Sequence, residues 1–262
     1  MYANHQNAER EFVKLERGED VAMRLENQRV VIIGGSSGIG LETARLALAE
    51  GGLVTIAGRS EDRLRRAADS VLSGADRLRA VVADLSEESS IRSLFAGEGH
   101  VDHVFVPAGE LRPGGGDLLK ADLDGLRSIL EVRLLGVTHV VRQARPKMEG
   151  GSITLMSGLY STRPAPGGGM AAAAVAAVEG MTRALALDLA PIRVNAVAPG
   201  LIDTPLWDSF GAQREAILAR GAKLPVGRIG RPEEVAAAVI FLMSNGFVTG
   251  AVLPIDGGGR LV

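Results

Sequence analysis

Short apolar runs alternate with longer amphipathic stretches along most of this chain. The runs are rich in valine, isoleucine and alanine, which is typical of strands buried on both faces, whereas apolar residues in the longer stretches recur at helical spacing. We predict strands at residues 29–33, 53–57, 78–82, 101–106, 151–156, 192–197 and 251–255, and helices at 41–48, 60–72, 118–144, 171–190 and 232–243.

Alternation of strands and helices predicts an α/β fold: one doubly wound parallel sheet with helices on both faces and the ligand at the carboxyl ends of the strands. No linker or repeat interrupts residues 28–262, which we predict to be a single domain. Residues 1–27 form an N-terminal extension, either a frayed arm or a segment docked on the domain or a neighbouring subunit. Residues 201–220 have the composition of a mobile lid.

Composition narrows the classes of function. Lysine and arginine number 29 against 31 acidic residues, and no basic stripe indicates a nucleic-acid partner. The absence of cysteine excludes disulfides and thiolate metal sites, and we predict no metal site. Because the N-terminus lacks an apolar signal core and no apolar run reaches membrane-spanning length, we expect a cytoplasmic protein without membrane contact.

The turn after the first strand predicts nucleotide binding. Gly34, Gly38 and Gly40 lie between a strand and an amphipathic helix. Without a Cβ in the way, a diphosphate can approach the N–H groups of the helix N-terminus, where the helix dipole favours negative charge. The spacing differs from the commonest dinucleotide fingerprint, and the alternative is a tight strand-to-helix turn with no ligand.

Two later residues are candidates to contact the adenosine half of a nucleotide. Arg59 follows the second strand, where a guanidinium suits a ribose 2′-phosphate and a carboxylate would suit a 2′-hydroxyl. We therefore expect NADP(H) in preference to NAD(H), and the alternative for Arg59 is a solvated loop charge. Asp84 closes the third strand, where it either accepts a hydrogen bond from the adenine amino group or caps the next helix.

Further motifs accompany the glycine turn: Asp84-Leu85, Ala108-Gly109, the run RVNAVAPG at 193–200, Thr204-Pro205 and the run DGG at 256–258. With these motifs, the chain from residue 28 onwards closely resembles the short-chain dehydrogenase/reductase family. The resemblance implies a Rossmann-type fold, a nicotinamide dinucleotide, a homotetramer or dimer, and reversible oxidation of alcohols to ketones.

The resemblance also implies which residues hold the cofactor. One group would contact the phosphates, Arg59 would select the ribose, another group would lie beside the adenine and the nucleotide, and a last group would hold the nicotinamide amide. In that order they are Gly34, Ser36, Ser37, Gly38, Ile39 and Gly40; then Arg59; then Asp84, Leu85, Ala108 and Gly109; then Pro199, Gly200, Ile202 and Thr204.

The family's catalytic residues do not carry over to this chain. The family uses a tyrosine, a lysine four residues later, a serine and an asparagine as a proton relay. Alignment of that pattern places Ala171 at the tyrosine, Val175 at the lysine, Gly158 at the serine and Arg133 at the asparagine. We therefore predict no catalytic residue.

Neighbouring hydroxyls do not restore the relay. Ser157 is adjacent to the serine position, but strand alternation directs it to the other side of the sheet unless the strand has already ended. Tyr160 lies in a loop near the site, yet Pro164 occupies the place of a lysine four residues later. Without a nearby cation a phenol titrates near pKa ~10 and is a poor proton shuttle at neutral pH.

Arg133 is the most informative of these substitutions. A guanidinium that stays charged must be paired or solvated, because an isolated buried charge is costly. Either it lines the former active site and receives an acidic ligand or a carboxylate of the chain, or it forms a structural ion pair that braces its helix.

The sequence therefore predicts a pseudoenzyme: a homo-oligomeric protein that binds NADP(H) and a small molecule, with a ligand-sensing or oligomer-partner role. The first alternative is an NADP(H)-dependent oxidoreductase with an unconventional acid, or with a substrate that needs no proton from the protein. The second alternative is a scaffold that no longer binds nucleotide.

Overall fold

The fold is described by a computed structural model, which covers residues 24–71, 74–107, 109 and 117–262. Its seven strands are β1 (Arg29–Ile33), β2 (Leu53–Gly58), β3 (Leu78–Val82), β4 (His103–Val106), β5 (Ser152–Met156), β6 (Arg193–Pro199) and β7 (Val252–Ile255). The α-helices are α2 (Gly38–Ala49), α3 (Glu61–Asp69), α4 (Glu88–Ala96), α5 (Leu123–Leu130), α6 (Gly136–Ala144), α7 (Gly169–Asp188), α8 (Gln213–Leu218) and α9 (Pro232–Ser244).

All neighbouring strands pair in parallel, in the order β3-β2-β1-β4-β5-β6-β7. The chain runs outwards from β1 to β3 and then crosses back to β4 on the other side of β1. The carboxyl ends of β1 and β4 therefore flank a topological switch point, which is where open α/β sheets bind their ligands. The predicted doubly wound parallel sheet is confirmed.

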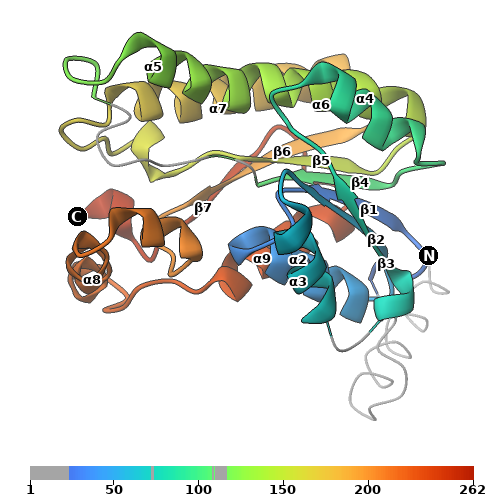
Figure 1. The fold of residues 1–262 in the computed structure, drawn as a ribbon, viewed down its shortest axis with the longest axis horizontal. Coiled ribbons are helices and arrows are strands. Elements are labelled where there is room, and N and C mark those ends of the chain that lie inside the picture. Colours follow the sequence, from blue (N-terminus) through green and yellow to red (C-terminus); the bar gives the residue numbers. More distant parts are fainter. Residues whose placement is uncertain (1–23, 72–73, 108, 110–116) are drawn as a thin grey trace, which may run out of the picture.

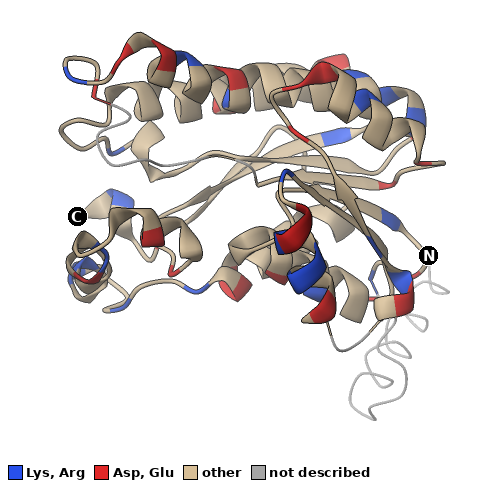
Figure 2. Ribbon diagram, viewed as in Figure 1, with Lys and Arg blue, Asp and Glu red and all other residues tan. Residues whose placement is uncertain are grey.

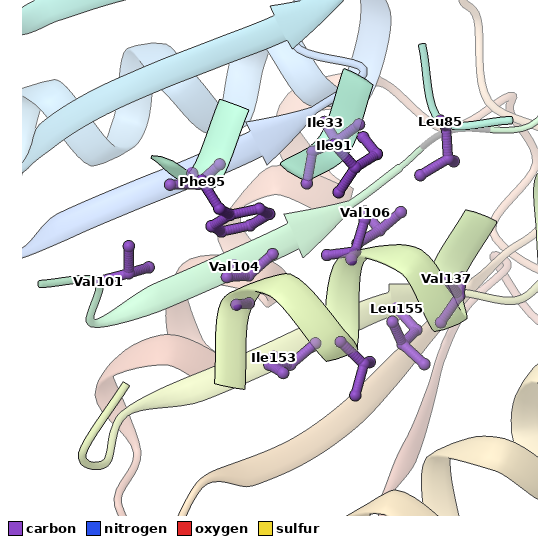
Figure 3. Packing of buried hydrophobic residues seen from close by; sticks show 14 of the residues in the cluster. Ile33, Leu85, Ile91, Phe95, Val101, Val104, Val106, Val137, Ile153 and Leu155 are labelled. Carbon is purple, nitrogen blue, oxygen red and sulfur yellow. The ribbon is translucent and has the colours of Figure 1, made fainter. Parts of the chain in front are cut away.

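Helices cover both faces of the sheet, with α4, α5, α6 and α7 on one side and α2, α3 and α9 on the other (Figure 1). Two apolar clusters fill the two interfaces. Figure 3 shows the first, in which Phe95 and Ile91 of α4 meet Val104 and Val106 of β4 and Val137 of α6. The strands read as continuous apolar runs because they are buried on both faces.

The predicted helix over 118–144 is wrong at its start and in its middle. Helix α5 begins at Leu123, after Asp122, whose side chain accepts a hydrogen bond of 2.7 Å from the N–H of Gly125. The π-helical segment Glu131–Leu135 separates α5 from α6. A π-helical turn often marks a functional site, and this one carries Arg133.

The packed body begins earlier than the predicted boundary at residue 28. Leu25 is completely buried, and its N–H donates to the carbonyl of Glu50 at 3.0 Å. Arg24 also pairs with the Glu50 carboxylate. Residues 24–27 therefore belong to the folded unit, while residues 1–23 lie outside the described part of the chain.

Helix α7 contradicts the expectation that no apolar run reaches membrane-spanning length. It is 20 residues long and apolar enough to cross a membrane by length and composition, alone among the helices of the described residues. Its inner face packs on β5 and β6, within the layer of helices that covers one face of the sheet. Among the described residues, this is weak evidence for a membrane span, because a helix of a layered fold passes the same test.

The predicted lid is a helical segment after β6. It consists of the 3-10 helix Pro205–Phe210, helix α8 and the 3-10 helix Ala219–Lys223. Trp207 anchors the beginning of the segment, since its indole N–H donates to the carbonyl of Ile202 at 2.7 Å. Its mobility stays a prediction.

Candidate functional site

The glycine turn after β1 has the geometry of a strand-to-helix loop with no room for side chains. Gly34 and Gly38 adopt positive φ values of 113° and 53°. A Cβ on Gly40 would overlap the carbonyl oxygen of Gly34. The glycine at position 40 is thus required by the chain's own backbone, whereas the sequence argument invoked clearance for a phosphate.

The start of α2 offers donors to an anion. Ser37 is the N-cap residue, and no side chain among the described residues caps this first turn. The N–H groups of Gly38, Ile39 and Gly40 therefore face the carboxyl edge of the sheet with the positive end of the helix dipole behind them. Thr204 lies next to this turn, since a Cβ on Gly38 would be 3.4 Å from its Cγ2.

Arg59 and Ser60 follow β2, as predicted. Arg59 is exposed, directly beyond the last residue of the strand. The Ser60 hydroxyl accepts a hydrogen bond of 3.3 Å from the N–H of Arg63 and caps α3. The cap fixes the direction in which the chain leaves β2, and so it fixes the place of Arg59 at the edge of the sheet.

Asp84 does not cap the following helix, whose N-cap residue is Glu87. Instead, its Oδ1 accepts hydrogen bonds from the N–H and the hydroxyl of Ser86, at 2.9 and 2.7 Å. The side chain of Leu85 is buried in the core cluster (Figure 3), where it lies against Gly136. A contact between Leu85 and adenine is therefore a prediction for its backbone alone.

The segment after β6 runs along the same edge of the sheet. Gly200 lies so close to Asp256 that an added Cβ would be 2.8 Å from its Cα. Ile202 is buried in the second core cluster, so only its backbone can reach a ligand. Pro199 ends β6, and Thr204 adjoins the glycine turn as described above. Ala108 lies outside the described residues, and Gly109 follows it.

The former relay positions come together beyond the ends of β4 and β5. Val106 pairs with Leu155, so Gly109 and Gly158 are each three residues past the same rung of the sheet. Val175 of α7 lies behind Gly158, with its Cγ1 3.8 Å from where a Cβ would be. Ala171 and Val175 are both buried. These positions offer no hydroxyl, phenol or ammonium group for proton transfer.

The two nearby hydroxyl residues are engaged elsewhere. Ser157 is buried, and its hydroxyl bonds to the carboxylate of Glu179 at 2.8 Å and to the carbonyl of Val175 at 3.3 Å. It is therefore tied to α7, the helix that carries two of the relay positions. The predicted direction towards the other side of the sheet is wrong, because β5 has already ended at Met156. Tyr160 packs its ring against Gly168, where an added Cβ would be 2.7 Å from Cε2.

Arg133 brings a cationic group to this site. A Cβ on Gly109 would lie 2.5 Å from Nη2 and 2.6 Å from Cζ of Arg133. The Nη1 atom is buried and has no hydrogen-bond partner. Burial lowers the pKa of the Arg133 guanidinium from its ordinary value, although such a group keeps its proton in proteins.

A structural ion pair for Arg133 is absent from the described part of the chain, since every ion pair recorded there joins other residues. The brace interpretation is therefore wrong for residues 24–71, 74–107, 109 and 117–262. The same residues contain no group of three or more histidine, aspartate or glutamate side chains that could hold a metal ion.

Comparison with known proteins identifies the family. Residues 34–259 match the family model described as enoyl-(acyl carrier protein) reductase. The short-chain dehydrogenase/reductase ATR9 of Stachybotrys chlorohalonatus is 35% identical over 257 residues, covering 90% of this chain and 98% of that protein. The chain belongs to the short-chain dehydrogenase/reductase family.

Solved structures of short-chain dehydrogenases/reductases superimpose closely on this chain. The MalC reductase/Diels-Alderase of Malbranchea aurantiaca is 31% identical, with a TM-score of 0.85 over 92% of this chain and 99% of that one. A small-chain dehydrogenase in complex with NADPH is 30% identical, with a TM-score of 0.77 over 90% of this chain and 100% of that one.

In this short-chain dehydrogenase/reductase, sequence reasoning missed two functional details. The contact between Gly109 and Arg133 joins β4 to the π-helical segment, and no local pattern predicts it. The Trp207 anchor was also missed, although a single tryptophan just after the Thr204-Pro205 motif was a signal that could have found it.

Proposed function

We propose that this chain binds NADP(H) and a small molecule without carrying the proton relay of its family, as a pseudoenzyme with a ligand-sensing or oligomer-partner role. The observation that carries the proposal is the replacement of the relay by Gly158, Ala171 and Val175, two of which are buried apolar side chains. A pocket wall of this kind neither donates nor accepts a proton. We also expect the protein to be cytoplasmic.

The residues at the edge of the sheet fit a nicotinamide dinucleotide. The uncapped first turn of α2 suits the diphosphate, and the exposed Arg59 suits a 2′-phosphate. Asp84 keeps its Oδ2 for the adenine, while the backbone of residues 199–204 would meet the nicotinamide amide. When bound, the reduced nicotinamide supplies a hydride, and these residues would orient it. The relative solved with NADPH supports this choice of cofactor.

Calorimetric titration with NADPH and, separately, NADH tests the cofactor. We expect micromolar binding that favours NADPH. Arg59→Ala should weaken NADPH binding about 10- to 100-fold, since a charge-assisted hydrogen bond contributes ~1.5–3 kcal/mol, and should leave NADH binding unchanged. Arg66→Ala, which removes an exposed guanidinium further along α3, is the control. No binding of either nucleotide would overturn the proposal.

Restoring the relay tests whether only the relay was lost. The quadruple variant Arg133→Asn, Gly158→Ser, Ala171→Tyr and Val175→Lys should reduce acetophenone with NADPH, while the wild type should not. Position 158 has room for the new side chain, because the nearest atoms to a Cβ there are 3.8 and 3.9 Å away. A variant that binds NADPH yet reduces no ketone would show that the substrate site has also diverged. Acetophenone reduction by the wild type would refute the pseudoenzyme proposal.

A second candidate function is hydride transfer to a substrate that needs no proton from the protein. Two observations favour it: the matched family is described as a reductase, and MalC is named as both a reductase and a Diels-Alderase. Positioning and electrostatics alone can supply much of a catalytic rate. Loss of NADPH absorbance with a candidate substrate, unchanged in Tyr160→Phe, would support this function over the pseudoenzyme.

A further inference from the structure

The guanidinium of Arg133 carries one unsatisfied donor inside the described part of the site. Its Nη1 and the Thr154 hydroxyl oxygen are the two buried side-chain polar atoms without a hydrogen-bond partner in the described part of the chain. Thr154 lies within β5, in the middle of the sheet. Arg133 instead lies at the carboxyl edge, where ligands of such sheets bind.

The position of this charge relative to the cofactor site follows from three contacts. A Cβ on Gly40 would lie 3.1 Å from Cγ of Pro107, and Pro107 is two residues from Gly109. Two residues span at most roughly 7 Å. The Arg133 guanidinium, which touches Gly109, is therefore close to the start of α2 and on the adjoining side of the sheet, towards Gly158.

We propose that Arg133 anchors the carboxylate of a small molecule with an apolar body, bound beside the dinucleotide. This inference rests on the proposed function and names the class of ligand for the same site. A guanidinium presents a planar fork of donors that matches the two oxygens of a carboxylate. Nη1, buried and without a partner, is a donor available for one of them.

The surroundings favour a carboxylate over a phosphate monoester. Arg133 supplies one positive charge, which one carboxylate neutralises, whereas a phosphate monoester carries a charge of about −1.5 to −2 at pH 7. The other former relay positions are Gly158, Ala171 and Val175, and they offer apolar contact. The π-helical segment that carries Arg133 packs against α7, which holds two of these residues.

An unpaired buried charge has a cost that a ligand would remove. Breaking a buried ion pair so that one charge is left alone is strongly destabilising, because the remaining charge has lost its water. Gly109 has no Cβ, and this lets the guanidinium lie against the backbone. The chain thus keeps a costly cation in place and shaped for an anion.

The test compares two probes of the same shape, cyclohexanecarboxylate and the neutral cyclohexanecarboxamide. Each is titrated calorimetrically into wild type, Arg133→Met and Arg133→Lys, with and without saturating NADP⁺. We expect the wild type to bind the carboxylate more tightly than the amide. Arg133→Met should lose about 10- to 100-fold in carboxylate affinity and nothing in amide affinity. Arg133→Lys should lie between, because it keeps the charge and loses the fork.

Two outcomes would overturn the inference: wild type that binds the carboxylate no more tightly than the amide, or equal carboxylate affinity in wild type and Arg133→Met. Titration with NADPH alone keeps this result separate from the proposed function. Normal NADPH binding with no preference for the carboxylate sinks only the inference. Absent NADPH binding would sink the proposed function and the placement beside the dinucleotide. The carboxylate anchor itself would still be tested, because the probes are also titrated without nucleotide.

Thermal unfolding gives a second readout. If Arg133 braced the structure, Arg133→Met would lower the melting temperature, whereas a ligand-binding role predicts no decrease. Without ligand, Arg133→Met should melt at or above the wild-type temperature, because it removes an unpaired buried charge. Saturating cyclohexanecarboxylate should raise the melting temperature of the wild type and leave that of the variant unchanged. A lower melting temperature in Arg133→Met, with no probe effect on the wild type, would indicate a structural brace.

Discussion

His103 at the amino end of β4 is a buried titratable group whose state can be read from its partners. Its Nε2 lies 2.7 Å from the Gln28 amide oxygen, which only accepts, so Nε2 carries the proton. Its Nδ1 then accepts from the Ser152 hydroxyl at 2.9 Å. Both ring nitrogens are therefore satisfied with the ring neutral.

We predict that His103 makes the stability of this protein fall in mild acid. Burial lowers the pKa of His103 from 6.5 to about 4. Between those values the unfolded chain binds a proton that the folded chain does not. The contribution of His103 to the free energy of unfolding is therefore complete above pH 6.5 and decreases as pH falls towards 4. The loss should reach about 3 kcal/mol.

Urea unfolding at pH values from 7 to 4 measures this effect in wild type and in His103→Gln. In the variant, the free energy of unfolding should decrease less steeply between pH 6.5 and 4. The difference in slope should correspond to at most one proton, and the rest of the profile should be unchanged. Identical slopes for the two proteins would contradict the assignment of the titration to His103.

At the scale of elements, the start of α2 depends on one atom that is missing from Gly40. We predict that Gly40→Ala destabilises the protein and weakens NADPH binding, because the new Cβ would overlap the Gly34 carbonyl and push the helix away from the sheet. The expected loss is about 1–3 kcal/mol or more. Gly150→Ala is the matched control, since a Cβ there meets nothing within 4 Å. Chemical unfolding and calorimetry measure both effects, and equal stability of the two variants would contradict the prediction.

Strands were the elements that the sequence predicted best. Runs such as Val30-Val31-Ile32-Ile33 are apolar throughout because both faces are buried, which is typical of strands inside a parallel sheet. The glycine turn was also predicted, although Gly40 serves the backbone of the protein itself. Both features are local, and a local pattern is sufficient to show them.

Features that depend on distant segments could not be predicted in this way. Leu118 and Leu119 suggested an early start for the long helix, yet they are 56% and 95% exposed. The π-helical segment interrupts a continuous apolar periodicity, which gives no signal for it. The contact of Arg133 with Gly109 joins residues on separate segments, so the sequence left both the ion pair and the ligand open for Arg133.

For the whole molecule, the outer face of α7 is the surface that the fold leaves uncovered. Ala173, Ala176 and Gly180 are exposed along it, and a Cβ on Gly180 would meet nothing within 4 Å. No charged residue occurs between Gly169 and Val178, so this part of the helix is drawn in tan (Figure 2). Small side chains of this kind allow a second helix to approach closely.

We therefore expect a homo-oligomer, a tetramer or dimer, that uses this face of α7. Ala176→Glu should shift the mass measured by light scattering after size exclusion towards the monomer, because the interface would have to bury a charge. Ser93→Glu places the same charge on an exposed position of α4 and should leave the mass unchanged. An oligomer unaffected by Ala176→Glu would place the interface elsewhere, and a monomeric wild type would refute the oligomer.

The position of Trp207 makes the protein its own optical reporter. It is the single tryptophan of the chain, and its indole N–H donates to the Ile202 carbonyl. Its backbone N–H donates to the Thr204 carbonyl at 3.2 Å. All intrinsic tryptophan emission therefore originates beside the glycine turn. Reduced nicotinamide absorbs light where tryptophan emits, so occupancy of the site can be followed by energy transfer from Trp207, without a label and without turnover.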